Sequence, residues 1–257
     1  MDAGAYGAPT WVDLSTPDVE VAMRFYRDLL GWTFERHDTP MTPGGAYYVA
    51  KAGEAEVGGM MTAGPEQHDT PMWTVFFNVA DVDETVGTIA QAGGAVLEPP
   101  FDIPDARIAV VADPTGGMFA LSTGLEPTGA WLSGTPGSVC WVELLTRDPA
   151  AAESFYATVF GWKADTEDVE GTRYTTFTLH DELVAGAMLM PDEMPAEAPE
   201  AFWSFYFAVG DCEAAEQRAA ALGGTIVRPT AEIGTGDAFA VVSDPTGATF
   251  QLMKPAA

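Results

Sequence analysis

The 257-residue chain has little basic charge: 11 Lys and Arg residues stand against 38 Asp and Glu residues, which gives a formal net charge of −27 at pH 7. So large a negative charge repels phosphate groups, and it argues against nucleic acid or an anionic membrane surface as a partner. Long apolar runs are also missing, since no stretch approaches the roughly 20 residues needed to cross a bilayer. We therefore expect neither nucleic-acid nor membrane binding.

Cysteine is equally scarce. Cys140 and Cys212 form no CxxC pair and no disulfide framework, so a reducing, cytoplasmic location is expected. The first eleven residues have neither a basic start nor an apolar core, and they predict no signal peptide. Because 47% of the residues are apolar, the chain can still bury a substantial core.

The sequence does contain a long internal repeat. Residues 11–32, WVDLSTPDVEVAMRFYRDLLGW, recur at 141–162 as WVELLTRDPAAAESFYATVFGW, and the correspondence runs on through VVADPTGGMFAL and VVSDPTGATFQL. This predicts two homologous domains. We place them at 1–125 and 139–257, joined by a linker at 126–138 that is rich in Gly, Pro, Ser and Thr.

Local signals place the helices and strands of the first unit in each half. The first helix is expected to begin with Thr16 as N-cap and Pro17 at N1 and to end at Gly31, and Asp148 and Pro149 take the two starting roles in the second half. Alternating apolar residues predict strands around it. In the first half these strands are 10–14, 32–36, 46–51 and 55–62.

The pattern then begins again inside each half. A strand at 72–79 precedes a helix from Asp81 to Gly93, and DPTG at 113–116 fits a type I turn between two of three further strands. The chain is thus predicted to be α+β, with four β-α-β-β-β units. Helices cover one face of each sheet, and the other face curls into a cup, giving two cups.

Motifs within these units recur in both halves. They are D-x6-FY-x4-GW (Asp18 to Trp32 and Asp148 to Trp162), DVDE followed by AGG, and DPTG. With them the chain resembles the vicinal oxygen chelate superfamily of glyoxalase I, bleomycin-resistance proteins and extradiol dioxygenases. More narrowly, it is similar to actinobacterial two-domain proteins of the glyoxalase or hydroxylase type. The resemblance implies tandem glyoxalase-like domains.

The resemblance also implies three metal-ligand positions on the strands of each cup. They correspond to Trp11, Thr74 and Ala120 in the first domain and to Trp141, Ser204 and Gln251 in the second. None of the six is His or Glu, and a tryptophan ring offers a metal no lone pair. The three histidines do not replace them, because His37 and His68 fall near predicted loops and His180 in a predicted hairpin. We therefore expect no metal site and no cofactor.

Strand alternation indicates what lines the cups instead. Val12 and Leu14 suit the helix side of the first strand, which leaves Trp11 and Asp13 facing the cup, like Trp141 and Glu143 in the second half. An apolar lining with a few polar groups is typical of small-molecule pockets. The other residues expected to bind a ligand are Thr74, Phe76, Asn78, Met118, Ser204, Tyr206, Thr249 and Gln251.

The two carboxylates have two interpretations. Asp13 or Glu143, desolvated beside a tryptophan, has a raised pKa and acts as a general base. Alternatively, each accepts hydrogen bonds from backbone N–H groups or an arginine, for which Arg107 and Arg173 are candidates, and only fixes the sheet. The tryptophans likewise either stack on a flat ligand or fill the cup as core.

Three functional hypotheses follow. The first is a metal-free protein that binds a small aromatic or planar molecule, in antibiotic resistance or natural-product metabolism. The second is an acid–base enzyme of secondary metabolism, of lyase or isomerase type, with Asp13 or Glu143 as the base. A metal-dependent lyase or dioxygenase ranks last. The expected partner is a small molecule, and the chain is expected to be a monomer, as an internal pseudo-dimer, or a homodimer.

Overall fold

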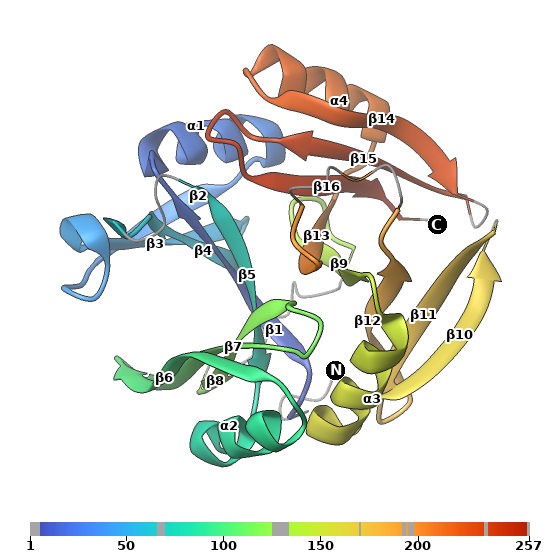
Figure 1. The fold of residues 1–257 in the computed structure, drawn as a ribbon. Coiled ribbons are helices and arrows are strands. Elements are labelled where there is room, and N and C mark those ends of the chain that lie inside the picture. Colours follow the sequence, from blue (N-terminus) through green and yellow to red (C-terminus); the bar gives the residue numbers. More distant parts are fainter. Residues whose placement is uncertain are drawn as a thin grey trace. The chain divides into compact units, whose positions relative to one another are not determined.

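A computed structural model describes residues 6–65, 70–124, 134–169, 171–191, 194, 198–233 and 236–255 (Figure 1). His68 and residues 126–133 of the expected linker lie outside these ranges. Across the described residues, none of the helices is long and apolar enough to span a membrane. The helices are α1 (Val19–Leu30), α2 (Val82–Gln91), α3 (Pro149–Phe160) and α4 (Cys212–Ala221), with a short 3-10 helix η1 (Pro43–Gly45).

In the described ranges, sixteen strands combine with these helices in four β-α-β-β-β units, which confirms the predicted fold class. The first repeat contains β1 (Pro9–Thr16), β2 (Thr33–Asp38), β3 (Ala46–Ala52), β4 (Ala55–Thr62), β5 (Met72–Asn78), β6 (Ala95–Ile103), β7 (Ala106–Ala112) and β8 (Met118–Thr123). The second contains β9 (Val139–Thr146), β10 (Lys163–Val169), β11 (Thr172–Leu179), β12 (Glu182–Leu189), β13 (Ala201–Ala208), β14 (Thr225–Ile233), β15 (Asp237–Ser243) and β16 (Thr249–Lys254).

Each repeat builds one open, mixed sheet of eight strands. The order is β2-β3-β4-β1-β5-β8-β7-β6 in the first repeat and β10-β11-β12-β9-β13-β16-β15-β14 in the second. In each sheet, the first and last strands of every β-α-β-β-β unit lie side by side and run parallel. In the first sheet these pairs are β1 with β4 and β5 with β8. Hairpins join the remaining neighbours within a unit as antiparallel strands.

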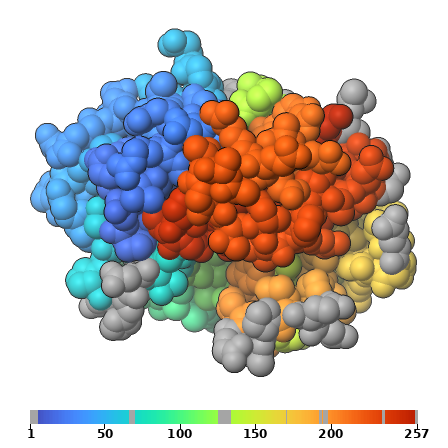
Figure 2. All heavy atoms as spheres, turned by 90° about the horizontal axis from the view of Figure 1, so that it is seen from above, coloured from blue at the N-terminus to red at the C-terminus, as the bar shows by residue number. Residues whose placement is uncertain are grey.

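The compact units of the chain do not coincide with its repeats. Unit 1 comprises residues 1–10, 74–127 and 142–204, and unit 2 comprises residues 11–73, 128–141 and 205–257. Each unit therefore combines one β-α-β-β-β element set from the first repeat with one from the second. In unit 2, α1 packs beside α4, and their atoms adjoin on the surface (Figure 2); in unit 1, α2 packs beside α3.

One predicted helix start is wrong and its counterpart is confirmed. Asp18, not Thr16, is the N-cap of α1, and its side chain accepts a hydrogen bond from the Val21 amide. The TPD sequence offers two capping residues, and the aspartate is the one that the helix uses. Asp148 caps α3 with Pro149 in the first turn, as predicted. Gly31 ends α1 in the left-handed conformation, at φ +74°.

The recurring FY and GW motifs form the aromatic core of each unit. In unit 2 the Tyr26 ring stacks on Trp32 at 5.2 Å and 19°, and in unit 1 Tyr156 stacks on Trp162 at 5.0 Å and 20°. The Trp162 indole donates to the carbonyl of Gly7 at 2.8 Å. These motifs are therefore explained by packing, not by chemistry at a site.

The DPTG motif is also structural, and it does more than turn the chain. The Gly116 amide donates to the Asp113 carbonyl at 3.0 Å, which confirms the predicted turn. The Asp113 carboxylate then accepts a 2.8 Å hydrogen bond from the hydroxyl of Tyr156, a residue of the other repeat. In unit 2, burial and the nearby Asp244 carboxylate raise the pKa of Tyr26 well above 10. The hydrogen bond of the motif thus ties the two repeats together inside unit 1.

Candidate functional site

A cluster of three hydrogen-bonding side chains lies in unit 2, on the sheet face opposite α1, where Trp11 and Asp13 are buried and Tyr47 is half-buried. The hydroxyl of Tyr47 donates to Oδ1 of Asp13 at 2.7 Å. The indole N–H of Trp11 lies 2.8 Å from the same oxygen and 2.9 Å from the Tyr47 hydroxyl. Val12 and Leu14, which alternate with Trp11 and Asp13 along β1, are fully buried on the helix side. The predicted alternation thus holds, and Asp13 is held by two neutral donors.

A glycine makes this cluster possible. Asp13 on β1 pairs with Gly59 on β4, so the Tyr47 side chain, coming from β3, must cross β4 to reach the carboxylate. A Cβ at position 59 would lie 1.8 Å from the Tyr47 hydroxyl oxygen and 2.3 Å from Oδ1 of Asp13. Only a residue without a side chain leaves that path open. Gly59 therefore belongs to the site although it carries no functional group.

Burial dominates the electrostatics of the cluster. Asp13 is only 8% exposed, and loss of hydration raises its pKa from 3.8 to about 6, even though the bonds from Tyr47 and Trp11 act to lower the pKa. Burial and the nearby Asp13 charge raise the pKa of Tyr47 well above 10, so its phenol remains a donor at neutral pH. The site thus combines a carboxyl group that titrates near pH 6 with a permanent hydroxyl donor.

The same sheet face continues from apolar to charged residues. Register places Val49 beside Gly59 and Met61 beside Tyr47, and both side chains are half-buried. Farther out on β2 and β3, the Lys51 ammonium binds Glu35 at 2.6 Å. His37 lies next to Glu35 near the end of β2, where it is exposed and close to the loop that follows the strand, as predicted. The face therefore offers an apolar patch between a buried acid and a charged rim, a mixture suited to small molecules.

The donors required for a metal are missing from this part of the fold. Within the described ranges, no three His, Cys, Asp or Glu side chains lie close enough together to hold a metal ion. At position 11 the only polar atom is an indole nitrogen, which has no lone pair to give and already donates to Asp13 and Tyr47. The donor chemistry here does not fit a divalent metal.

The second repeat carries the same residue pattern in register. Glu143 on β9 pairs with Gly186 on β12, as Asp13 pairs with Gly59, and Tyr174 on β11 pairs with Met188, as Tyr47 pairs with Met61. Glu143 is buried and Trp141 and Tyr174 are half-buried. The surroundings differ, because Leu145 and Thr176 replace Ser15 and Val49. An acid–Tyr–Gly pattern is thus common to both repeats.

The two tyrosines and two glycines were not among the predicted site residues. Equivalent residues of the two repeats lie 130 positions apart at Trp11 and Trp141 but 127 apart at Tyr47 and Tyr174, because the connection between β2 and β3 is longer than that between β10 and β11. Alignment of VGG at 57–59 with VAG at 184–186 brings Gly59 onto Gly186 and Tyr47 onto Tyr174.

The remaining predicted residues lie on the second half of each sheet. Thr74, Phe76 and Asn78 alternate with helix-facing Val75 and Phe77 on β5, and Phe76 pairs with Ala120 on β8, near Met118. In the second repeat Tyr206 pairs with Gln251 and contacts the Phe239 ring at 6.1 Å. Ser204 is buried, whereas Thr249 is exposed and bonds Ser243 at 2.8 Å. Their role in binding stays a prediction.

Arginine is not the partner of the first carboxylate. Arg107 binds Asp83 and Asp102 at 2.7 and 2.8 Å, and Arg173 binds Glu153 at 2.9 Å. Instead, Trp11 and Tyr47 hold Asp13. Neutral donors compensate a buried charge less than a guanidinium would, which is why the pKa of Asp13 remains raised.

Comparison with known proteins places these features in a family. The model of the "Glyoxalase/Bleomycin resistance protein/Dioxygenase superfamily" matches residues 9–121 and 138–252. "Putative glyoxylase CFP32" of Mycobacterium tuberculosis is 37% identical over 255 residues, covering 97% of this chain and 95% of the relative. "Anthracycline biosynthesis protein DnrV" of Streptomyces peucetius is 33% identical over 269 residues, covering 99% and 95%.

Solved structures show the same fold at low identity. The Mn(II)-bound glyoxalase from Novosphingobium aromaticivorans superposes with a TM-score of 0.64 and 16% identity, over 97% of this chain and 82% of that one. An extradiol ring-cleaving dioxygenase from B. fuscum gives a TM-score of 0.65 and 15% identity, over 99% and 73%.

Proposed function

Since the chain belongs to the glyoxalase/bleomycin resistance protein/dioxygenase superfamily, we propose that it binds a small aromatic or planar molecule on the open sheet face around Asp13, without a metal. The observation that carries this proposal is the buried Asp13 carboxylate, held by Tyr47 and Trp11 next to the apolar Val49 and Met61. A hydrogen bond donated to Asp13 by a hydroxyl or N–H group of the ligand replaces the water hydrogen bonds that the carboxylate loses on burial.

The family supports a use in natural-product chemistry. Two relatives that align over 99% of this chain are named anthracycline biosynthesis proteins. Polyphenolic ring systems of that kind supply both the flat surface and the hydroxyl donors that this face can accept. We place the protein in the metabolism or sequestration of such compounds.

Fluorescence titration with a hydroxylated anthraquinone, such as alizarin, tests the proposal. Quenching of tryptophan emission should saturate, and EDTA should not change the dissociation constant. Asp13→Asn should weaken binding about tenfold, since one charge-assisted hydrogen bond contributes about 1.5 kcal/mol or more. Asp28→Asn, an exposed aspartate on α1, is the matched control. Binding that EDTA abolishes, or that both variants leave unchanged, contradicts the proposal.

The raised pKa favours a second candidate function, acid–base catalysis by Asp13. A carboxyl group with a pKa of about 6 exchanges protons close to neutral pH, where an ordinary aspartate does not. Turnover of a bound ligand would then show an inflection near pH 6. Asp13→Asn would abolish kcat while leaving the ligand bound; a pH-independent kcat would rule this function out.

A further inference from the structure

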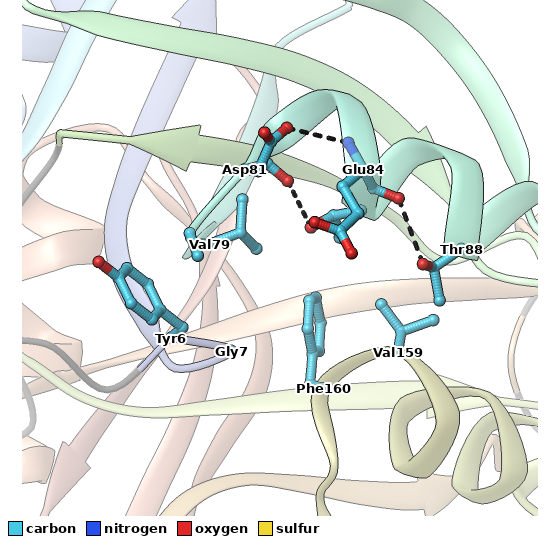
Figure 3. A pocket seen from close by; sticks show the side chains of 10 residues that line it. Tyr6, Gly7, Val79, Asp81, Glu84, Thr88, Val159 and Phe160 are labelled. Atoms are coloured by element: carbon cyan, nitrogen blue, oxygen red, sulfur yellow. Dashed lines mark hydrogen bonds between the residues drawn. The ribbon is translucent and has the colours of Figure 1, made fainter.

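The groove between α2 and α3 differs from its internal counterpart in unit 2. A cavity of about 340 Å3 opens between them, lined on one side by Glu84 and Thr88 of α2 and on the other by Val159 and Phe160 of α3 (Figure 3). The Thr88 hydroxyl turns back to the Glu84 carbonyl of its own helix, at 3.2 Å. It therefore does not bridge to α3.

In unit 2 an arginine makes that bridge. Asp81 and Asp211 are the equivalent N-caps of α2 and α4. Thr88 of α2 therefore corresponds to Arg218 of α4, since each lies seven residues after its cap. The Arg218 guanidinium donates through Nε to the carbonyl of Asp28, in the last turn of α1. In α3 the residue equivalent to Asp28 is Thr158, which directly precedes the two lining residues. The α1–α4 pair of unit 2 thus holds a guanidinium, and the equivalent α2–α3 pair of unit 1 has a threonine in its place.

The chemistry of the unit 1 groove suits the missing group. The last carbonyls of α3 carry the negative end of the helix dipole, which favours a cation. Glu84 adds a carboxylate where unit 2 has Ala214. Val159 and Phe160 provide apolar surface for an alkyl chain or for the face of a planar cation. A volume of about 340 Å3 lies within the range of small-molecule sites.

We infer that the α2–α3 groove of unit 1 is a binding site for a small molecule that carries a guanidinium group, which takes the place that Arg218 fills in unit 2. This site is separate from the residues around Asp13 and does not depend on the function proposed for them.

Titration with N-butylguanidinium, followed by amide NMR shifts of α2 and α3, tests the inference, and N-butylurea is the neutral control of the same shape. The wild-type protein should bind the cation at least tenfold more tightly than the urea. Thr88→Arg should close the groove from within and weaken binding at least tenfold, without lowering Tm. Gly87→Arg adds the same charge on the same helix, where a side chain meets open space, and should retain binding.

Three results would overturn the inference: no binding by the wild-type protein, equal affinity for the cation and the urea, or equal losses in Thr88→Arg and Gly87→Arg. If Thr88→Arg does not fold, Glu84→Gln decides. Because Glu84 is exposed, this variant should fold normally. It should bind N-butylguanidinium severalfold more weakly than the wild-type protein, and unchanged affinity in a folded Glu84→Gln variant would also overturn the inference.

Discussion

Asp13 shows how burial and hydrogen bonding compete at one residue. Desolvation raises its pKa to about 6, and the bonds from Tyr47 and Trp11 recover only part of the cost of the buried charge. The sequence predicted a carboxylate beside Trp11 in an apolar setting. The sequence did not predict Tyr47, because Tyr47 and Asp13 come together only when the strands β3, β4 and β1 pair.

The raised pKa has a consequence for stability. Between about pH 4 and pH 6 native Asp13 holds a proton that the unfolded chain has lost, so the free energy of unfolding should fall as pH rises through this window, by up to about 3 kcal/mol. Urea unfolding at several pH values gives the free energy of unfolding of the wild-type protein and of Asp13→Asn. The difference between the two isolates the pH-dependent contribution of Asp13. A difference that grows in favour of the wild type with rising pH would contradict the assignment.

Tyr47 should act on Asp13 through its hydroxyl alone. Tyr47→Phe removes a bond that lowers the pKa of Asp13 and keeps the ring, so the pKa should rise above about 6. Carboxyl carbon NMR measures it directly. Tyr48→Phe is the matched control, since the Tyr48 hydroxyl contacts Arg36 instead. An unchanged or lower pKa in Tyr47→Phe would mean that the hydroxyl does not stabilise the carboxylate.

At the scale of elements, the strands match prediction more closely than the site does. The strand from 55 to 62 was placed correctly because its alternation and the neighbouring Gly53 turn are local signals. The function of Gly59 within it is not local, since its missing side chain matters only when Tyr47 crosses above it.

Gly59→Ala should therefore disrupt the cluster. The new methyl group overlaps the Tyr47 hydroxyl, and we expect a loss of about 1–3 kcal/mol of stability together with loss of alizarin binding. Gly87→Ala, in an exposed part of α2 with open space around it, should instead stabilise the protein by roughly 0.5–1 kcal/mol. Chemical denaturation compares the two, and equal effects would show that position 59 has no special constraint.

At the scale of the whole molecule, the two repeats are interleaved. Each compact unit takes half its elements from each repeat, and the Tyr156–Asp113 bond at 2.8 Å joins residues of different repeats inside unit 1. The repeat boundaries therefore do not mark the units that bury the aromatic core.

A fragment of residues 1–125 should consequently not be a folded monomer. Alone it lacks the partner elements of both units, and we expect it to be unfolded or to pair with a second copy, because the repeats are alike. Mixing it with residues 126–257 should restore a 1:1 complex, which size-exclusion chromatography and circular dichroism would detect. A stable folded monomer of 1–125 would contradict the interleaved arrangement.

The sequence by itself determined the duplication, the four β-α-β-β-β units, the faces of the strands and the absence of metal donors at the expected positions. These follow from periodicity, capping and residue chemistry, which are local. Only the tertiary structure decided that Tyr47 and Gly59 join Trp11 and Asp13, and that Tyr156 of one repeat bonds Asp113 of the other. It also decided that Arg218 bridges α4 and α1, whereas a cavity lies beside Thr88 at the equivalent position between α2 and α3. These depend on strand register and on which helices pack together, and neither is encoded at a fixed spacing along the chain.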